Sequence, residues 1–143
     1  MDQKPERTVR KLITQAADLK HWRMHALLDE LGLHRGQVFV LYALWDTDGI
    51  TQSELTERLG RSPSTITKNV QRLERAGLVK RCGDDSDERV SRVFLTDAGR
   101  DIRPAVEEVW VRLDQQVLAG FSAQELAQFQ DFLTRVCQNI QES

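Results

Sequence analysis

The sequence contains no uninterrupted apolar run that approaches the roughly 20 residues needed to span a bilayer. Its first residues, MDQKPERTVRKL, also lack the apolar core of a secretory signal peptide. Only two cysteines are present, and Cys82 and Cys137 are too far apart to form a CxxC pair. We therefore expect a cytoplasmic protein with reduced thiols, no disulfide framework, no zinc ribbon and no attachment to a membrane.

Catalytic signatures are missing as well. The sequence has no GxSxG or HExxH motif and no glycine-rich loop to hold phosphate groups. Its three histidines all lie between His21 and His34. Cys137 lies on an apolar stripe and is expected in the core, while Cys82 has no neighbouring partner for redox chemistry. These features predict a protein that is not an enzyme, needs no cofactor and does not sense oxidants.

What the sequence does contain is a local excess of positive charge. Between Arg58 and Arg81 there are seven basic residues and one acidic residue, a local net charge of +6, which leaves -8 on the remainder to give the formal total of -2. A basic segment on an otherwise acidic chain indicates a face that binds a polyanion. A solvated, charged helix without a partner is the alternative interpretation.

Length and apolar periodicity predict one mainly α-helical domain with a small β-hairpin. The 143 residues are enough for a single core and too few for two. Apolar residues recur at helical spacing from about Thr8 to Leu31, in a second helix that begins at His34, and in two segments near the C-terminus. In the first of these segments Pro104 marks either a kink or a second helix start, and Ser122 caps the last helix.

The central segment has the pattern of a helix-turn-helix motif. Thr51 caps a supporting helix, with Glu54 at the capping-box position. Ser62 caps the next helix, which has Pro63 at its first position and runs to about Ala76. In this recognition helix the apolar residues Ile66, Val70 and Leu73 face inward, which turns five polar residues toward solvent: Ser64, Thr65, Thr67, Lys68 and Gln71. Small hydroxyl groups and one long cation suit close docking in a DNA groove.

A hairpin follows directly. Gly77 ends the recognition helix, and LVKRC and RVSRVFL are the predicted strands around a polar tip from Gly83 to Glu88. Residues 35–96 thus have the pattern of a winged helix-turn-helix module. The terminal segments, 1–34 and 97–143, carry more apolar helix surface than the module covers, so we expect them to form a homodimer. Terminal helices that fold back on their own chain are the alternative. A dimer would hold two recognition helices roughly 34 Å apart, as a palindromic operator requires.

The pattern DxRxxxxxLTxxG is formed by Asp87, Arg89, Leu95, Thr96 and Gly99, directly downstream of RLERAGLVKR. This motif, the order of the helices and the length of the chain resemble the MarR (multiple-antibiotic-resistance regulator) family of bacterial winged helix-turn-helix transcription factors. The resemblance implies a ligand-responsive repressor that binds a palindromic operator as a homodimer. It also implies a recognition helix in the major groove and a wing arginine in the minor groove.

Carried over position by position, the resemblance implies base and phosphate contacts from Ser64, Thr65, Thr67 and Lys68, and a minor-groove contact from Arg89. Asp87 is expected to hold the Arg89 guanidinium through a charge-assisted hydrogen bond. Phosphate contacts, which position a protein without reading sequence, are expected from Arg61, Arg72 and Arg92. Ser62 and Gln71 complete the expected DNA-binding set.

The wing departs from the pattern in being strongly acidic, with Asp84, Asp85, Asp87 and Glu88. These carboxylates repel phosphate unless they are paired or point away. We therefore expect a shorter reach into the minor groove and a stronger dependence on Arg89.

Members of this family commonly respond to small aromatic or anionic ligands, metal ions or oxidants. Trp22, Tyr42 and Trp45 are predicted to line a ligand cleft, with Arg23, His25 or Arg35 meeting an anionic group. An ordinary core is the alternative for these aromatic residues.

The spacing of His21 and His25, at i and i+4, suits a metal ion, but no histidine follows His34 to complete a site, so none is expected. Two other functions stay open: a winged-helix protein-interaction module that does not bind DNA, and a metal-responsive regulator.

Overall fold

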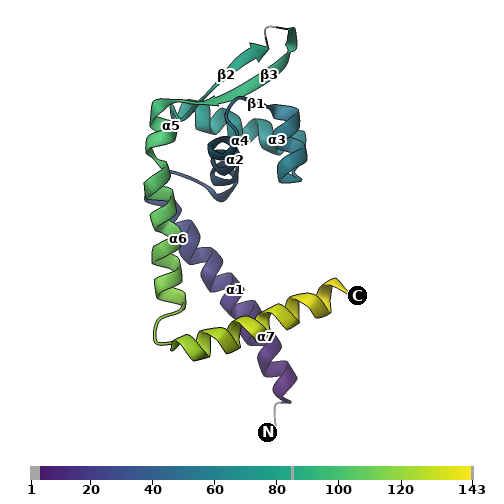
Figure 1. Ribbon diagram of the computed structural model, residues 1–143, viewed down its shortest axis with the longest axis vertical. Coiled ribbons are helices and arrows are strands. Elements are labelled where there is room, and N and C mark those ends of the chain that lie inside the picture. The colour runs from purple at the N-terminus through teal and green to yellow at the C-terminus, as the bar shows by residue number, and fades with distance from the viewer. Residues whose placement is uncertain (1–3, 85, 143) are drawn as a thin grey trace.

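The computed structural model describes residues 4–84 and 86–142, with a winged module at one end and long helices at the other (Figure 1). The elements are α1 (Pro5–Asp29), α2 (Arg35–Asp46), β1 (Ile50–Thr51), α3 (Gln52–Leu59), α4 (Pro63–Arg75), β2 (Val79–Asp84), β3 (Asp87–Leu95), α5 (Asp97–Asp101), α6 (Arg103–Val117) and α7 (Ala123–Gln141). The predicted fold class, mainly α with a β-hairpin wing, is confirmed.

The helices α3 and α4 begin at the capping residues that the sequence predicts. The Thr51 hydroxyl accepts a hydrogen bond from the Glu54 amide at 3.1 Å, and the Glu54 carboxylate accepts one from the Thr51 amide at 3.1 Å. At the start of α4 the Ser62 hydroxyl accepts from the Thr65 amide at 3.3 Å. Pro104 marks a second start rather than a kink, because it lies in the first turn of α6 and separates that helix from α5.

The sheet is antiparallel, with β3 in the centre between β1 and β2. The pairing of β1 with β3 connects the wing to the helix-turn-helix part of the chain. The wing strands are longer than predicted, because the pairing of Asp84 with Asp87 continues the ladder to the tip, after a register shift between Gly83 and Asp84. Polar residues that the sequence assigns to a loop therefore belong to strands, and Asp85 lies outside the described residues.

The core lies between α2, α3, α4 and the sheet, and it continues between the C-terminal part of α1 and α6. On α4 the side chains of Ile66, Val70 and Leu73 are at most 1% exposed, which confirms the predicted inward face. α1 contributes Met24, Leu27 and Leu28 to the same cluster, and α6 contributes Val106, Val109 and Leu113.

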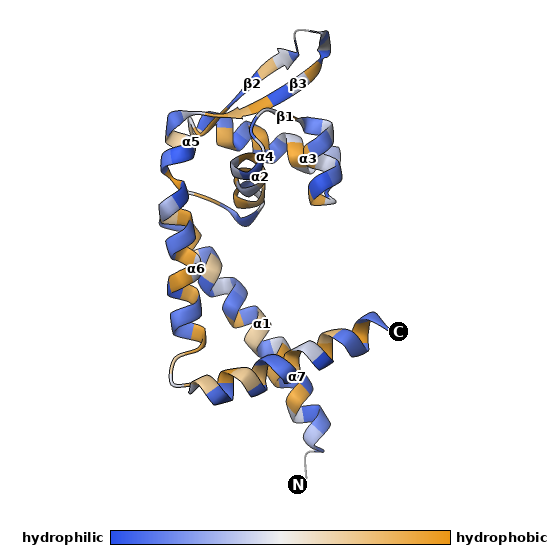
Figure 2. Ribbon diagram, in the orientation of Figure 1, coloured by the Kyte–Doolittle hydropathy of each residue, from blue (hydrophilic) through white to orange (hydrophobic). Residues whose placement is uncertain are grey.

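Apolar residues recur along the terminal helices (Figure 2), and several of their side chains are exposed. α7 has no buried residue over its described length, Ala123–Gln141. The prediction that Cys137 lies in the core is therefore wrong for the single chain, because its thiol is on α7 and exposed. The large exposed apolar residues are Val9, Leu12, Ile13, Leu19 and Trp22 on α1, Val111 and Val117 on α6, Phe121 between α6 and α7, and Phe129, Phe132, Leu133 and Ile140 on α7. None of the helices within the described ranges is long and apolar enough to cross a membrane.

Candidate nucleic-acid interface

α4 has a buried face and a polar face on opposite sides. Ser64, Lys68 and Gln71 follow one another at i, i+4 and i+7 on the exposed side, and Arg75 extends this stripe by one turn. The 100° step of an α-helix places Thr65 and Arg72, both exposed, on one flank of the stripe. Thr67 lies on the other flank and is half-buried.

Asn69 and Arg75 are two residues of this helix that sequence reasoning missed. Asn69 is only 8% exposed on the inward face, where α4 meets α2. A Cβ at Gly36 of α2 would lie 2.6 Å from the Asn69 side-chain nitrogen, so the two helices approach closely at this point. Arg75 was detectable, because it continues the stripe of Ser64, Lys68 and Gln71 at helical spacing.

Hydroxyl groups gather at the N-terminus of α4. The Ser62 Oγ lies 2.8 Å from the Thr65 Oγ1 and 3.2 Å from the Ser64 Oγ, and all three residues are exposed. The first backbone N–H groups of a helix have no intrahelical acceptor and carry a partial positive charge, so this end suits a phosphate group.

Two of the seven basic residues between Arg58 and Arg81 are committed to partners within the protein. Arg58 donates to the Asp46 carboxylate at 3.3 Å, and Arg81 donates to both oxygens of the Glu74 carboxylate at 3.1 and 3.2 Å. Hydrogen bonds from the Arg81 guanidinium lower the pKa of Glu74. The other five have no ion pair with any residue in the ranges 4–84 and 86–142: Arg61, Lys68, Arg72, Arg75 and Lys80.

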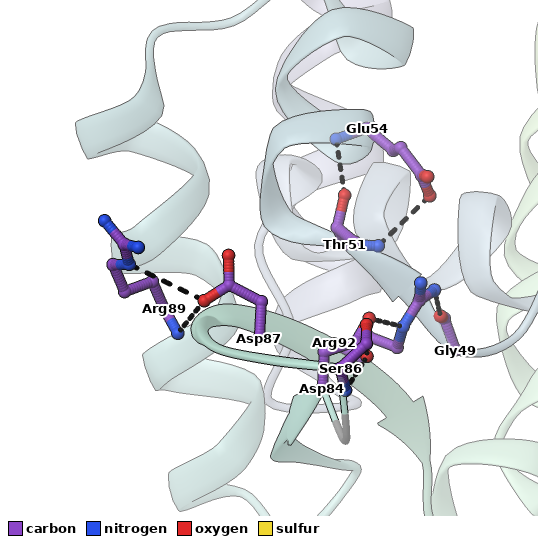
Figure 3. A network of polar contacts seen from close by, with 8 residues as sticks. All are labelled: Gly49, Thr51, Glu54, Asp84, Ser86, Asp87, Arg89 and Arg92. Atoms are coloured by element: carbon purple, nitrogen blue, oxygen red, sulfur yellow. Dashed lines mark hydrogen bonds and ion pairs between the residues drawn. The ribbon is translucent and has the colours of Figure 1, made fainter.

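Arg89 extends from the wing into solvent, and its side chain is 94% exposed. Its Nε lies 3.6 Å from the Asp87 Oδ1, the oxygen that accepts a hydrogen bond from the Arg89 backbone amide at 3.0 Å (Figure 3). The first distance is too long for a hydrogen bond. Asp87 therefore fixes the Arg89 backbone and attracts the guanidinium through an ion pair.

Asp84 and Arg92 form a closer pair within the wing (Figure 3). The Arg92 Nε donates to the Asp84 Oδ2 at 2.9 Å, and the Arg92 Nη1 donates to the Gly49 carbonyl at 2.9 Å. The Asp84 Oδ1 accepts from the Ser86 hydroxyl at 2.7 Å and from the Ser86 amide at 2.9 Å. Hydrogen bonds from Ser86, followed by that from Arg92, lower the pKa of Asp84 to about 2.

A cleft of about 770 Å³ opens between the helices α1 and α2 and the helices α3 and α4. Its apolar wall includes Phe39, and the Arg35 guanidinium carbon lies 5.1 Å from the centroid of that ring. His25 and His34 also line the cleft. Its cationic character comes from four arginines, Arg35, Arg58, Arg61 and Arg72.

The remaining residues of the predicted ligand site do not line this cleft. Trp22 is 68% exposed on α1. Arg23 donates a hydrogen bond to the Gln116 side chain at 2.7 Å. Tyr42 and Trp45 pack edge to face, with ring centroids 5.0 Å apart.

The rings of Tyr42 and Trp45 join α2 to the helices that follow the wing. The Tyr42 hydroxyl accepts a hydrogen bond from the Trp110 indole at 2.6 Å, and the Trp45 indole donates to the Gly99 carbonyl at 2.9 Å. Of the six predicted ligand-binding residues, the cleft therefore brings together His25 and Arg35.

Comparison with known proteins identifies the family. Residues 33–91 match the family model described as MarR family. The transcriptional regulator HosA of Escherichia coli is 30% identical over 104 residues, which cover 73% of this chain and 77% of HosA. The chain belongs to the MarR family. It is therefore a winged helix-turn-helix transcriptional regulator and not an enzyme.

Solved structures of transcriptional regulators have the same fold. PcaV, a transcriptional regulator from Streptomyces coelicolor, is 30% identical with a TM-score of 0.83, and the match covers 93% of this chain and 97% of PcaV. A mutant of MarR from E. coli, complexed with operator DNA, is 26% identical with a TM-score of 0.70, and the match covers 95% of this chain and 99% of that one.

The second half of the DxRxxxxxLTxxG motif fastens the wing of this MarR-family chain to its core. The Thr96 hydroxyl donates to the Gly77 carbonyl at 2.6 Å and accepts from the Gly99 amide at 3.1 Å. The Thr96 amide donates to the Leu78 carbonyl at 3.0 Å. A Cβ at Gly99 would collide with that carbonyl oxygen, so only glycine allows this close approach.

Two histidines of α1 lie side by side, with 3.1 Å between the Nε2 atoms of His21 and His25. The two rings lie edge to face, with their centroids 4.4 Å apart. Across the parts of this MarR-family chain that the structure describes, no group of three or more potential metal ligands is present.

Proposed function

We propose that this MarR-family regulator binds a palindromic operator as a homodimer and represses transcription, and that a small aromatic or anionic ligand releases it. The observation that carries the proposal is the exposed polar stripe of α4, which lies in a segment with five cations that lack an ion-pair partner among the described residues. Such cations are available to phosphate groups, whose neutralisation supplies much of the affinity of a protein for DNA.

In this proposal α4 lies in the major groove. Ser64, Lys68 and Gln71 point away from the core, toward base edges, and the short side chain of Ser64 lets the helix backbone come close to the bases. The residues on the flank toward the cleft and at the helix start contact phosphates: Arg61, Ser62, Thr65 and Arg72. Thr67, which is half-buried, makes the most peripheral contact.

The wing supplies a second contact. Arg89 is almost fully exposed and has the reach to enter an adjacent minor groove, whose negative potential attracts guanidinium groups. Asp87 restrains the direction of that side chain through the 3.6 Å ion pair.

The exposed apolar faces of α1, α6 and α7 support the homodimer. Side chains such as Leu12, Phe132 and Ile140 are more than half exposed in the single chain, where they would be in contact with water. Exposed apolar side chains in this number are typical of an interface. A second copy that covers it would also fix the separation of the two α4 helices.

The cleft is the proposed ligand site, because it combines an aromatic wall with several arginines. Arg61, Thr65 and Arg72 line it and are also proposed DNA contacts. A bound aromatic carboxylate would therefore occupy cations that DNA requires. Repression itself follows from a dimer that covers promoter DNA, since this needs no further partner.

Selection of bound sequences from a random DNA pool tests the whole proposal, at low and raised salt and with simple aromatic carboxylic acids present or absent. We expect an enriched palindrome with half-sites about 10 base pairs apart, an affinity that falls steeply with salt, and weaker retention with an acid. A strictly monomeric protein, or one that retains no DNA at low ionic strength, contradicts the proposal. A winged-helix module that binds only proteins would show no counterion release.

A further inference from the structure

We propose that Asp84 and Arg92 form a clamp that positions the wing so that Arg89 meets the DNA. In this role Arg92 is a positioning residue and not a phosphate contact, and Asp84 is not simply a repulsive charge. The proposal rests on the DNA-binding function proposed above and concerns how the wing is held for it (Figure 3). The term clamp refers below to Asp84, Arg92 and the Gly49 carbonyl.

The Arg92 guanidinium is already occupied within the protein. Arg92 lies on the central strand β3, where it pairs with Thr51 of β1 on one side and with Cys82 of β2 on the other. Its Nε and Nη1 donate in different directions, to the Asp84 carboxylate and to the Gly49 carbonyl, both at 2.9 Å. A phosphate contact through these two nitrogens would have to break both bonds.

The Gly49 carbonyl is a rigid acceptor. Gly49 has φ +72°, and a Cβ there would lie 2.6 Å from the Phe94 ring, so the backbone conformation and the close packing both require glycine. The preceding Asp48 accepts hydrogen bonds from the Gly49 amide at 3.0 Å and from the Leu95 amide at 2.8 Å. Arg92 therefore connects the wing to a turn that is itself fastened to the base of β3.

Asp84 is the acceptor on the other side of the clamp, and it lies where the strand register shifts. Its Oδ1 takes both hydrogen bonds from Ser86 and its Oδ2 takes the one from Arg92. The side chain is 17% exposed, in contrast to the 94% of Arg89. The carboxylate is thus satisfied by protein donors, and it closes the end of the hairpin.

The two arginines of the wing have different surroundings and so different roles. Among the described residues Arg89 has one ion pair, at 3.6 Å, and it projects into solvent, whereas Arg92 makes two short hydrogen bonds. An isolated two-stranded hairpin is marginally stable, so its direction needs a connection to the rest of the fold. Fixing that direction before binding reduces the ordering cost of inserting Arg89.

Two substitutions distinguish the clamp from simple charge effects. The probe is a DNA duplex that the wild-type protein has enriched from a random pool. Asp84→Asn removes a negative charge near DNA, so repulsion alone predicts tighter binding, whereas loss of the clamp predicts weaker binding. Arg92→Lys keeps the positive charge but cannot make two hydrogen bonds in different directions. A phosphate contact predicts nearly unchanged affinity for this variant.

We expect each variant to bind roughly threefold to tenfold more weakly, the scale of one ordinary hydrogen bond. The slope of log affinity against log salt should change no more than it does in Arg89→Ala, because Arg92 itself makes no phosphate contact. Combining Asp84→Asn with Arg89→Ala should add little to the loss caused by Arg89→Ala alone, since a misplaced Arg89 contributes little. Fully additive losses would overturn the proposal.

Thermal unfolding followed by circular dichroism checks that the variants are folded. Should Asp84→Asn unfold the module, Ser86→Ala offers a milder test, because it removes the 2.7 Å hydroxyl hydrogen bond and no charge. We expect a smaller loss of affinity from it, and unchanged affinity would overturn the clamp. Wild-type protein that fails to bind the duplex refutes the proposed function. Wild-type binding with equal or tighter binding by Asp84→Asn refutes only the clamp.

Discussion

Removing an unpaired arginine should change the salt dependence of DNA binding, whereas removing a paired arginine together with its partner should not. Arg72→Ala removes a cation on the flank of α4 that has no ion pair among the described residues. Its control is the double variant Arg81→Ala with Glu74→Gln, which deletes a bound pair in the same basic segment and leaves the net charge unchanged. Both variants alter one arginine, and only the first alters a cation that is free to meet phosphate.

The expected size follows from counterion release. Each neutralised phosphate contributes about 0.9 to the slope of log affinity against log salt, so a dimer that loses one contact per protomer loses about 1.8. Between 50 and 200 mM salt the affinity of Arg72→Ala should then fall about twelvefold less than that of the wild type. The paired control should keep the wild-type slope and lose at most about 1 kcal/mol of stability, because the pair is partly exposed.

Fluorescence anisotropy of a labelled duplex, titrated at several salt concentrations, measures both slopes. The reasoning is refuted if Arg72→Ala keeps the wild-type slope while the double variant lowers it. That result would mean that the arginine bound to Glu74 in the free protein is the one that meets phosphate, through an exchange of partners on binding.

Four further outcomes are expected. Arg89→Ala should weaken operator binding in a gel shift and leave the dimer mass unchanged, and full affinity would exclude the wing from the interface. Lys68→Ala should relax the preference at one operator position by about 1–3 kcal/mol, whereas equal losses on all sequences would make it a phosphate contact. Phe132, on the apolar face of α7, is 56% exposed, so Phe132→Glu puts a charge on that face and should dissociate the dimer in sedimentation; an unchanged association constant would place the interface elsewhere. The pKa of Asp84 is lowered from 3.8 to about 2, so its bonds stabilise the wing above pH 3.8 and are lost as the pH falls from there through 2; a carboxyl titration midpoint by NMR near 3.8 would contradict this.

Local signals made much of the fold predictable from the sequence. Ser62 and Pro63 fix the start of α4 by backbone chemistry that acts over a few residues, and the spacing of Ile66, Val70 and Leu73 fixes its buried face. The exposed stripe follows from the same periodicity. Short-range rules thus define the exposed stripe of α4. They also identify Arg75, because it continues the same helical spacing into the last turn of the helix.

Long-range partners were not predictable in the same way. Arg92 donates to a carbonyl that is 43 residues away in sequence, and Trp45 donates to one that is 54 residues away. Each pairing depends on how strands and helices meet in three dimensions, and a pattern of residue types does not specify that. For the same reason the aromatic residues Tyr42 and Trp45 gave no sign that they join α2 to α5 and α6 instead of lining the cleft.

The charge near the proposed DNA-binding surface depends on both composition and ion pairing. The basic segment has a net charge of +6 by sequence, and the ion pair of Arg58 with Asp46 brings in one carboxylate from outside it. Five cations of the segment have no ion pair among the described residues, one fewer than the net charge of +6, because Asp46 lies outside the segment. On the wing, Asp84 and Asp87 are matched by Arg92 and Arg89, so these four charges cancel locally. If the wing contacts DNA as proposed, phosphate meets less repulsion from it while these pairs persist than the formal charge of the hairpin suggests.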